Sequence, residues 1–393
     1  MRIVSTILLS TLAIYGDSVV DDMDGFGEDE VIVEDSNIST PTKEPLVEGL
    51  TGEFTQQIVY SPNSKAPHDD ISSLKSSLFL DYEHKFDSGI RVKINGNAYY
   101  DTIYRLKGED DFTPQEIGEL ESEVELFDAF VEGKIASNFD YKIGRQVVVW
   151  GRSDTIRVTD ILNPIDNRTP GMVDIEDLRL PVAMAKFDYF VGDWRVTPIA
   201  ILEQRFSKMP PVGSEFNLIP IDIEDREYND VSYALSVSGE FSGWDISLYG
   251  ANTRNDAGYL DMDNPTLGVV HNRVKMAGLA LNILTGSWLF KGEFAYFDGL
   301  KYSSTGDREF SRDDMLLGVE YNGIVDTTIS YDIVRRSIHN YDGILLAQKN
   351  PLEKYDYQHA FRVSSEFFNA SLKANYLISL YGEKLDEGGF QRL

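Results

Sequence analysis

Seven short polar or glycine-containing turns divide most of this chain into pairs of runs in which apolar and polar residues alternate. The turns lie at 86–89, 138–140, 192–194, 242–244, 286–288, 323–326 and 368–370. Longer polar connections separate the pairs, at 62–70, 106–121, 152–180, 208–228, 255–271, 300–312, 340–353 and 385–387. Short turns at one end, long connections at the other and period-two strands between them are typical of an antiparallel transmembrane β-barrel.

Alternation gives each predicted strand one apolar and one polar face, because successive side chains of a strand point to opposite sides. A soluble β-sandwich is the alternative, and two observations argue against it. The polar faces carry charges of both signs in mid-strand, as at Lys186, Glu293 and Asp332, which suits a water-filled interior. Three tryptophans directly follow short turns, namely Trp194, Trp244 and Trp288. One aromatic belt of a membrane barrel would lie at this position.

Counting the runs predicts about 16 strands over residues 51–393. Fifteen runs are complete, and the tail 388–393 resembles the start of a sixteenth. The tail is shorter than the roughly nine to eleven residues that a strand needs to cross a bilayer. It also lacks a terminal Phe or Trp. We therefore expect either a short final strand or a truncated chain.

The N-terminus has the organisation of a secretory signal. Arg2 precedes the apolar stretch Ile3 to Ile14, and small residues follow, so we predict a signal peptide over 1–18. A buried N-terminal strand or helix is the alternative interpretation. Residues 19–50 are strongly acidic and lack an apolar pattern, which predicts a disordered periplasmic arm. A calcium loop at 22–33 is disfavoured because Phe26 and Val33 occupy ligand positions.

Composition excludes several classes of function. The formal net charge of −29 disfavours binding to nucleic acid. After the N-terminus no apolar run is long enough for a membrane-spanning helix, and the chain contains no cysteine. The five histidines are scattered and show no catalytic constellation. We therefore predict no catalytic residues, no metal site and no cofactor.

The connection 152–180 is the longest and the most distinctive. It mixes aliphatic residues such as Ile156 and Val158 with many charges, and Asn163-Pro164 and 169–171 form turns. A loop that folds into the barrel packs its aliphatics on the wall and pairs its charges. An external loop held by salt bridges is the alternative. The residues that we predict to line the constriction or lumen are Arg145, Trp150, Arg152, Asp154, Arg157, Asp160, Asp166, Arg168, Asp174, Arg179, Lys186, Asp188, Glu203 and Arg205.

Three motifs around this connection resemble a known family. They are Gly-Arg-Gln-Val-Val-Val-Trp-Gly at 144–151, Asn-Pro-Ile-Asp at 163–166 and Arg-Leu-Pro at 179–181. The chain resembles an uncharacterised proteobacterial outer-membrane β-barrel family, the domain of unknown function thirteen-oh-two. The resemblance implies an envelope barrel. It also implies a role beside inner-membrane exporters of hydrophobic substrates, and so the transport of lipids or other apolar molecules.

The function predicted from these observations is an outer-membrane channel of a Gram-negative bacterium that passes a small or apolar solute. Carboxylates outnumber basic residues, so cations or neutral solutes are expected to pass more readily than anions. The alternative is a closed barrel that acts as a receptor or as the partner subunit of an envelope transport system. A lipid-binding surface enzyme is a third hypothesis. We expect the barrel to be surrounded by outer-membrane lipid. By analogy with porins, a homo-oligomer is a further hypothesis.

Overall fold

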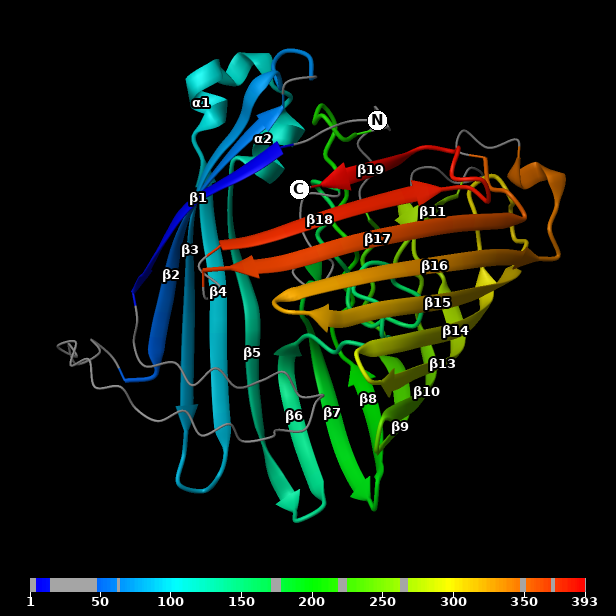
Figure 1. Cartoon of the computed structure of the whole chain (residues 1–393). Helices are drawn as coiled ribbons and strands as arrows, with labels where there is room; N and C mark the ends of the chain where they lie inside the picture. The colour runs from blue at the N-terminus through cyan, green and yellow to red at the C-terminus, as the bar shows by residue number, and fades with distance from the viewer. Residues whose placement is uncertain are drawn as a thin grey trace.

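The computed structural model describes residues 5–14, 48–61, 64–170, 178–217, 225–261, 268–346, 351–368 and 372–392. One large antiparallel sheet dominates this part of the chain and curls around an interior (Figure 1). Its strands are β1 (Ser5–Ile14), β2 (Leu50–Ser61), β3 (Asp70–Lys85), β4 (Arg91–Asp101), β5 (Ser122–Ala136), β6 (Phe139–Gln146), β7 (Val182–Val191), β8 (Trp194–Ile201), β9 (Ser232–Phe241), β10 (Trp244–Arg254), β13 (Arg273–Thr285), β14 (Trp288–Leu300), β15 (Phe310–Ile324), β16 (Thr327–His339), β17 (Tyr355–Phe367), β18 (Leu372–Tyr381) and β19 (Gly389–Arg392).

Short elements occupy the long connections at one end of this sheet. They are α1 (Ile103–Lys107), η1 (Glu109–Asp111), α2 (Pro114–Leu120), η3 (Gly343–Leu345) and a small hairpin of β11 (Tyr259–Leu260) and β12 (Val269–Val270). Figure 1 shows α1 and α2 at the end of β3, β4 and β5 that lies opposite the hairpin turns. No helix in the described residues is long and apolar enough to cross a membrane.

The sheet confirms the predicted barrel architecture. Strands that follow each other in sequence pair antiparallel, and β2 to β10 with β13 to β19 make sixteen. The short turns and long connections alternate along the chain as predicted, although 369–371 of the last turn lie outside the described residues. The predicted sixteenth strand is present as the short β19, which pairs with β18.

The N-terminal segment adds one more strand. β1 lies within the predicted signal peptide and pairs antiparallel with β2, so a strand, one of the two alternatives considered for this segment, is its conformation here. Cleavage of residues 1–18 stays a prediction. Of the acidic arm predicted over 19–50, all but 48–50 lies outside the described residues.

Three strands end four or more residues earlier than the alternation predicted. β4 ends at Asp101 instead of 105, because the Asp101 carboxylate accepts the backbone N–H of Ile103 at the start of α1. β6 ends at Gln146 instead of 151, since the Asn163 side chain accepts the backbone N–H of Val148. β8 ends at 201 instead of 207, where the chain leaves the wall to form part of the site described below.

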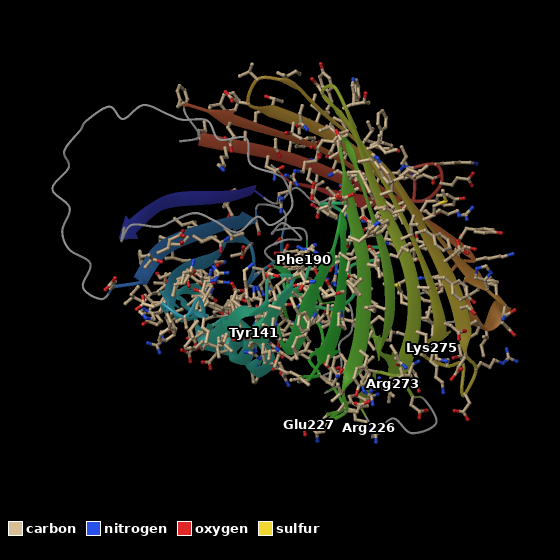
Figure 2. All side chains as sticks on the ribbon, turned by 90° about the horizontal axis from the view of Figure 1, so that it is seen from below. Tyr141, Phe190, Arg226, Glu227, Arg273 and Lys275 are labelled. Carbon is tan, nitrogen blue, oxygen red and sulfur yellow. The ribbon has the colours of Figure 1, made fainter. Side chains whose placement is uncertain are left out.

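The two faces of the sheet differ as the alternation predicted, and β14 illustrates this. Phe290 and Phe294 are exposed on the outer face, whereas Lys291 and Glu293 are buried on the inner face. Figure 2 shows side chains projecting from both faces of the curled sheet. An outer face with exposed aromatic and aliphatic side chains suits contact with lipid, and the polar inner face suits water.

Aromatic residues gather on the outer face beside the short turns. Trp194 packs edge-on against Phe241, and the ring of Phe241 stacks on Trp244 with 4.3 Å between centroids. In the hairpin of β13 and β14, Trp288 contacts Tyr321 in a tilted arrangement with 4.5 Å between centroids. The predicted recurrence of tryptophans therefore forms one rim of the sheet, where a barrel places its interfacial aromatics.

The hydrophobic core lies inside the curl of the sheet. Residues 147–181, here called the inward segment, contribute Trp150, Ile156, Val158 and Leu162 to it. These side chains pack with inward-facing wall residues such as Met276. The inward segment therefore folds against the inner wall, as its aliphatic residues predicted, and is not an external loop. Its residues 171–177 lie outside the described part.

Candidate functional site

Asn163 closes the inward segment at its base. Its side-chain amide donates to the carbonyl oxygens of Gln146 at 3.3 Å and of Leu180 at 2.9 Å. Its side-chain oxygen accepts the backbone N–H of Val148 at 2.8 Å. One buried side chain thus joins the two ends of the segment where they leave and rejoin the wall, which makes the segment a closed loop within the lumen.

Asp160 organises the middle of the inward segment. Its carboxylate is buried and accepts from the Nε of Arg179 at 2.8 Å and from the Nε of Arg157 at 3.2 Å. Arg157 also donates to the carbonyl oxygen of Asn163 at 2.6 Å. Paired charges of this kind are tolerated in a buried position because each charge has hydrogen-bonded partners.

Glu293 on β14 holds the tip of the segment, residues 151–159. One carboxylate oxygen accepts the backbone N–H groups of Arg152 at 2.6 Å and Ser153 at 3.0 Å. The other accepts the backbone N–H of Thr159 at 3.2 Å and its hydroxyl at 2.8 Å. The residue is 3% exposed, so a single buried carboxylate satisfies four donors of the tip.

Further contacts attach the tip to neighbouring strands. Asp332 on β16 accepts from the hydroxyls of Ser153 and Thr155, each at 2.7 Å. Lys291 on β14 pairs with Asp154 at 3.0 Å, and Arg152 pairs with Asp245 on β10. The ring of Trp150 also stacks on Tyr249 of β10, with 4.5 Å between centroids. The tip is thereby bound to three strands of one wall.

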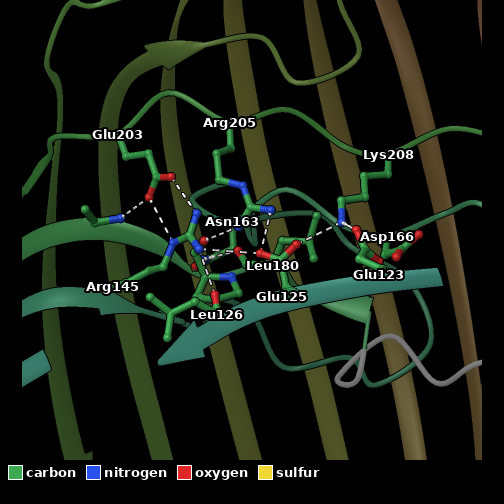
Figure 3. A network of polar contacts seen from close by, with 12 residues as sticks. Glu123, Glu125, Leu126, Arg145, Asn163, Asp166, Leu180, Glu203, Arg205 and Lys208 are labelled. Carbon is green, nitrogen blue, oxygen red and sulfur yellow. Dashed lines mark hydrogen bonds and ion pairs between the residues drawn. The ribbon is translucent and has the colours of Figure 1, made fainter. Parts of the chain in front are cut away.

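A second group of charges lies at the mouth, where β5 and β6 meet the segment after β8 (Figure 3). Arg145 donates to Glu203 at 2.6 Å and to Glu125 at 3.5 Å. Arg205 donates to Glu125 at 2.9 Å, and Lys208 reaches the same carboxylate at 2.9 Å. These ion pairs join the wall strand β5 to the chain that follows β8.

The same group continues into the inward segment. Lys208 also pairs with Glu123, and Arg168 donates to Glu123 at 2.6 Å. The Nε of Arg168 donates to Asp166 at 2.9 Å. We call this set the mouth network. It has four carboxylates and four basic side chains, namely Glu123, Glu125, Asp166, Glu203, Arg145, Arg168, Arg205 and Lys208.

Comparison with known families and structures gives one decisive match. The family described as "Protein of unknown function (DUF1302)" matches residues 68–312, which include the wall strands β3 to β10, β13 and β14 and the whole inward segment. The chain belongs to this family. No curated protein of similar sequence was found.

Solved porin structures are among those that resemble this member of the DUF1302 family. A porin refined at 1.8 Å resolution is 14% identical, with 84% of this chain and 93% of that chain covered and a TM-score of 0.42. An anion-selective porin from Comamonas acidovorans is 10% identical, covering 83% and 82% of the two chains with a TM-score of 0.45. Salmonella typhi OmpF in complex with daunomycin is 10% identical, covering 84% and 90% with a TM-score of 0.46.

The predicted site residues separate into three groups. Arg145, Asp166, Arg168, Glu203 and Arg205 belong to the mouth network. The base, middle and tip of the inward segment contain Trp150, Arg152, Asp154, Arg157, Asp160 and Arg179. Lys186 and Asp188 pair with each other on β7 at 3.2 Å and have no contact with either group within the described residues. Asp174 lies outside the described residues.

The sequence prediction of the site missed its wall partners. Glu123, Glu125 and Lys208 complete the mouth network, while Glu293 and Asp332 hold the tip. The alternation did identify Glu293 and Asp332 as inward-facing charges, but it gave no sign of what they bind. A buried charge on a polar face, taken together with the excess of donors in 151–159, is the signal that connects them.

Charge pairing shifts the pKa values of the mouth network. Burial raises the pKa of the Asp166 carboxyl, but hydrogen bonds and charge attraction from Arg168 outweigh this and leave it below its usual range. The pKa of Glu203 is also lowered, because the hydrogen bonds from Arg145 and the backbone of Ala183 exceed the effect of burial. Both carboxylates therefore remain charged at neutral pH and keep the network paired.

The described residues contain no group of three or more carboxylate or histidine side chains placed to hold a metal ion. The mouth network instead consists of ion pairs that join segments of the chain.

Proposed function

We propose that this protein is a porin-like channel of the outer membrane of a Gram-negative bacterium, and that it passes a small solute without catalysing a reaction. The observation that carries the proposal is the inward segment. A polar-lined sheet of sixteen strands contains a closed loop, bound at its base by Asn163 and at its tip by Glu293. A loop fixed in this way narrows a lumen to a defined width, which suits selective passage.

The outer face supports a membrane location. Exposed apolar side chains such as Leu235, Phe294 and Leu317 lie on outward positions of β9, β14 and β15. The rim of Trp194, Trp244 and Trp288 stands at one end of this apolar surface. A soluble protein rarely leaves so many large apolar side chains in water, whereas lipid accommodates them.

A closed barrel is the second candidate function, and the packing inside the lumen favours it. The inward segment shares one buried cluster with Leu345 of η3 and with wall residues Val334 and Ala360. A lumen filled to that extent suits a receptor or the partner subunit of an envelope transport system. In that case the acidic arm 19–50 would dock a basic periplasmic partner or an inner-membrane exporter.

Planar-bilayer recording of the whole chain distinguishes the two functions. The channel proposal expects discrete conductance steps in the wild type, and larger steps once the loop is released. Release is obtained in two ways, by deletion of 152–180 and by the substitution Glu293→Gln, which keeps the segment present. Absence of conductance in the wild type and in both variants, each shown to be folded, would overturn the channel and favour the closed barrel.

A further inference from the structure

We propose that solute passes along the inner faces of β3 to β7, here called the open wall, and that this path favours molecules without net charge, either zwitterionic or uncharged and polar. The inference rests on the proposed channel function and names its path and its class of solute. It follows from which side of the lumen the inward segment covers, and from how charges are arranged on the opposite side.

Charged side chains on the two sides of the lumen differ in exposure. Glu293 on β14 and Asp332 on β16 are each 3% exposed, because the tip of the inward segment covers them. On the open wall, Glu83 retains 42% and Glu132 retains 26% of its side-chain surface. Water therefore reaches the inner faces of β3 to β7, whereas protein fills the space in front of β14 and β16.

The outward neighbours confirm that these open-wall charges face the interior. Leu80 and Ile94 alternate with Asp81 and Lys93 along β3 and β4, and both apolar side chains are exposed on the outer face. On β6, Ile143 next to Lys142 is likewise exposed on the outer face. Strand alternation then places the charged members of each pair on the lumen side.

Opposite charges alternate across the open wall from β3 to β6. Arg91 on β4 pairs with Glu83 on β3 at 3.3 Å and with Glu132 on β5 at 2.6 Å. Lys142 on β6 approaches Glu132 at 3.7 Å. Lys93 pairs with Asp81 at 3.4 Å within the same belt. The belt therefore consists of fixed, mutually paired charges that extend across β3 to β6.

The sum of these charges is close to zero. The paired charges of the open wall comprise six carboxylates and five basic side chains, namely Asp81, Glu83, Asp128, Glu132, Asp140, Asp188, Arg91, Lys93, Lys134, Lys142 and Lys186. The mouth network has four of each sign. These two sets together thus carry a net charge of −1, although the whole chain carries −29.

Balanced, paired charges do not concentrate ions of one sign, because their fields cancel over a few ångströms. The acidic charge elsewhere on the chain is screened beyond about 8 Å at physiological ionic strength. A cation and an anion therefore meet similar barriers at the open wall, and each loses hydration on entering a narrow space. A molecule without net charge avoids that cost, and its dipoles find both donors and acceptors on the belt.

Reversal-potential measurements in a potassium chloride gradient test the inference. The wild type is expected to show a ratio of potassium to chloride permeability within about threefold of one, since no sign dominates the wall. The double variant Glu83→Gln/Glu132→Gln removes two carboxylates of the belt, leaves it with an excess of basic side chains and is expected to favour chloride. The opposite variant, Arg91→Gln/Lys142→Gln, is expected to favour potassium.

A matched control changes the same total charge away from the path. Glu227 lies in an exposed loop, and Asp298 lies on the outer face of β14. Figure 2 shows Glu227 at the margin of the sheet beside Arg226. The double variant Glu227→Gln/Asp298→Asn is expected to leave the permeability ratio at the wild-type value, because neither side chain meets the solute.

The outcomes separate the two proposals. Shifts of opposite sign in the two open-wall variants, with an unchanged control, support the inference. Strong cation selectivity in the wild type, or a control shift as large as those of the open-wall variants, overturns it while the channel function stands. Absence of any current in the wild type overturns the channel function itself. If one open-wall variant does not fold, the permeability ratio of the wild type and that of the opposite variant still test the inference.

Cysteine accessibility locates the path independently, because the natural chain contains no cysteine. Lys93→Cys lies on the open wall, and Ala280→Cys lies on β13 beneath the inward segment, where Ala280 is fully buried. A negatively charged thiosulfonate reagent is expected to react with Lys93→Cys and to change its conductance, and to leave Ala280→Cys unmodified. Faster reaction at Ala280→Cys would place the path on the other side of the inward segment and refute the inference.

Discussion

Replacement of Glu293 by glutamine is expected to release the tip of the inward segment and to enlarge the conductance of the channel. The wild-type carboxylate accepts four hydrogen bonds, two on each oxygen. Glutamine keeps the size and shape of the side chain but replaces one acceptor oxygen with an NH₂ donor. At least two donors of the tip then face another donor instead of an acceptor.

The cost follows from which contacts glutamine can keep. The least costly placement turns the NH₂ toward Thr159, whose hydroxyl can rotate to accept. The backbone N–H of Thr159 is then left buried without an acceptor, at roughly 1–3 kcal/mol. The bonds from Arg152 and Ser153 lose their charge-assisted strength, which is about half of each. The total is about 3 kcal/mol, and this lowers the ratio of docked to released tip by roughly a hundredfold.

Single-channel recording and limited proteolysis measure this release together. Glu293→Gln is expected to give larger or noisier conductance steps and faster cleavage within 151–159. Glu293→Ala is expected to increase both effects further. The matched control is Glu309→Gln, because Glu309 is exposed in a loop and the charge change is the same. Wild-type conductance together with wild-type protease resistance in Glu293→Gln would show that this carboxylate does not hold the tip.

Three other perturbations test the packing of the inward segment. Asn163→Ala leaves the buried donors and acceptors at the base unpaired and is expected to cost about 2–3 kcal/mol, read as a lower midpoint of thermal unfolding in detergent. Trp150→Ala removes the ring stacked on Tyr249 and is expected to cost about 3–5 kcal/mol, measured by denaturant unfolding; a loss below 1 kcal/mol would contradict the buried stack. Acidification is expected to loosen the mouth. The lowered pKa values of Asp166 and Glu203 give a stabilisation that is complete above their unfolded-state pKa values, near 4, and is lost as pH falls through the lower folded-state values. Pepsin cleavage within 163–170 and 202–208 that does not change between pH 4 and pH 2 would contradict this.

The sequence predicted the strands well because period-two alternation is a local signal. β14 shows this, since its exposed Phe290 and Phe294 and its buried Lys291 and Glu293 alternate along the chain as they do in the structure. The inward course of 147–181 was predictable for a similar reason. Aliphatic residues such as Ile156 require a dry surface, and the inner wall offers one to this loop.

The partners of the site were not predictable in the same way. Glu293 is 141 residues from Arg152 in the chain, and Asp332 is 179 residues from Ser153. Which strand faces the tip depends on how far the sheet curls and on the stagger of all the strands between. Alternation gives only the side on which a charge lies. The irregularity at Gly144, with a φ of +132°, also breaks the simple alternation just before Arg145 and the site.

The attachment of the tip to β10, β14 and β16 has a consequence for biogenesis. The segment emerges early during synthesis, whereas the acceptors that hold it belong to strands made much later. Contacts between such distant parts of a chain form slowly. The tip is therefore expected to dock only after the C-terminal half of the sheet has formed, so its attachment is a late step of folding.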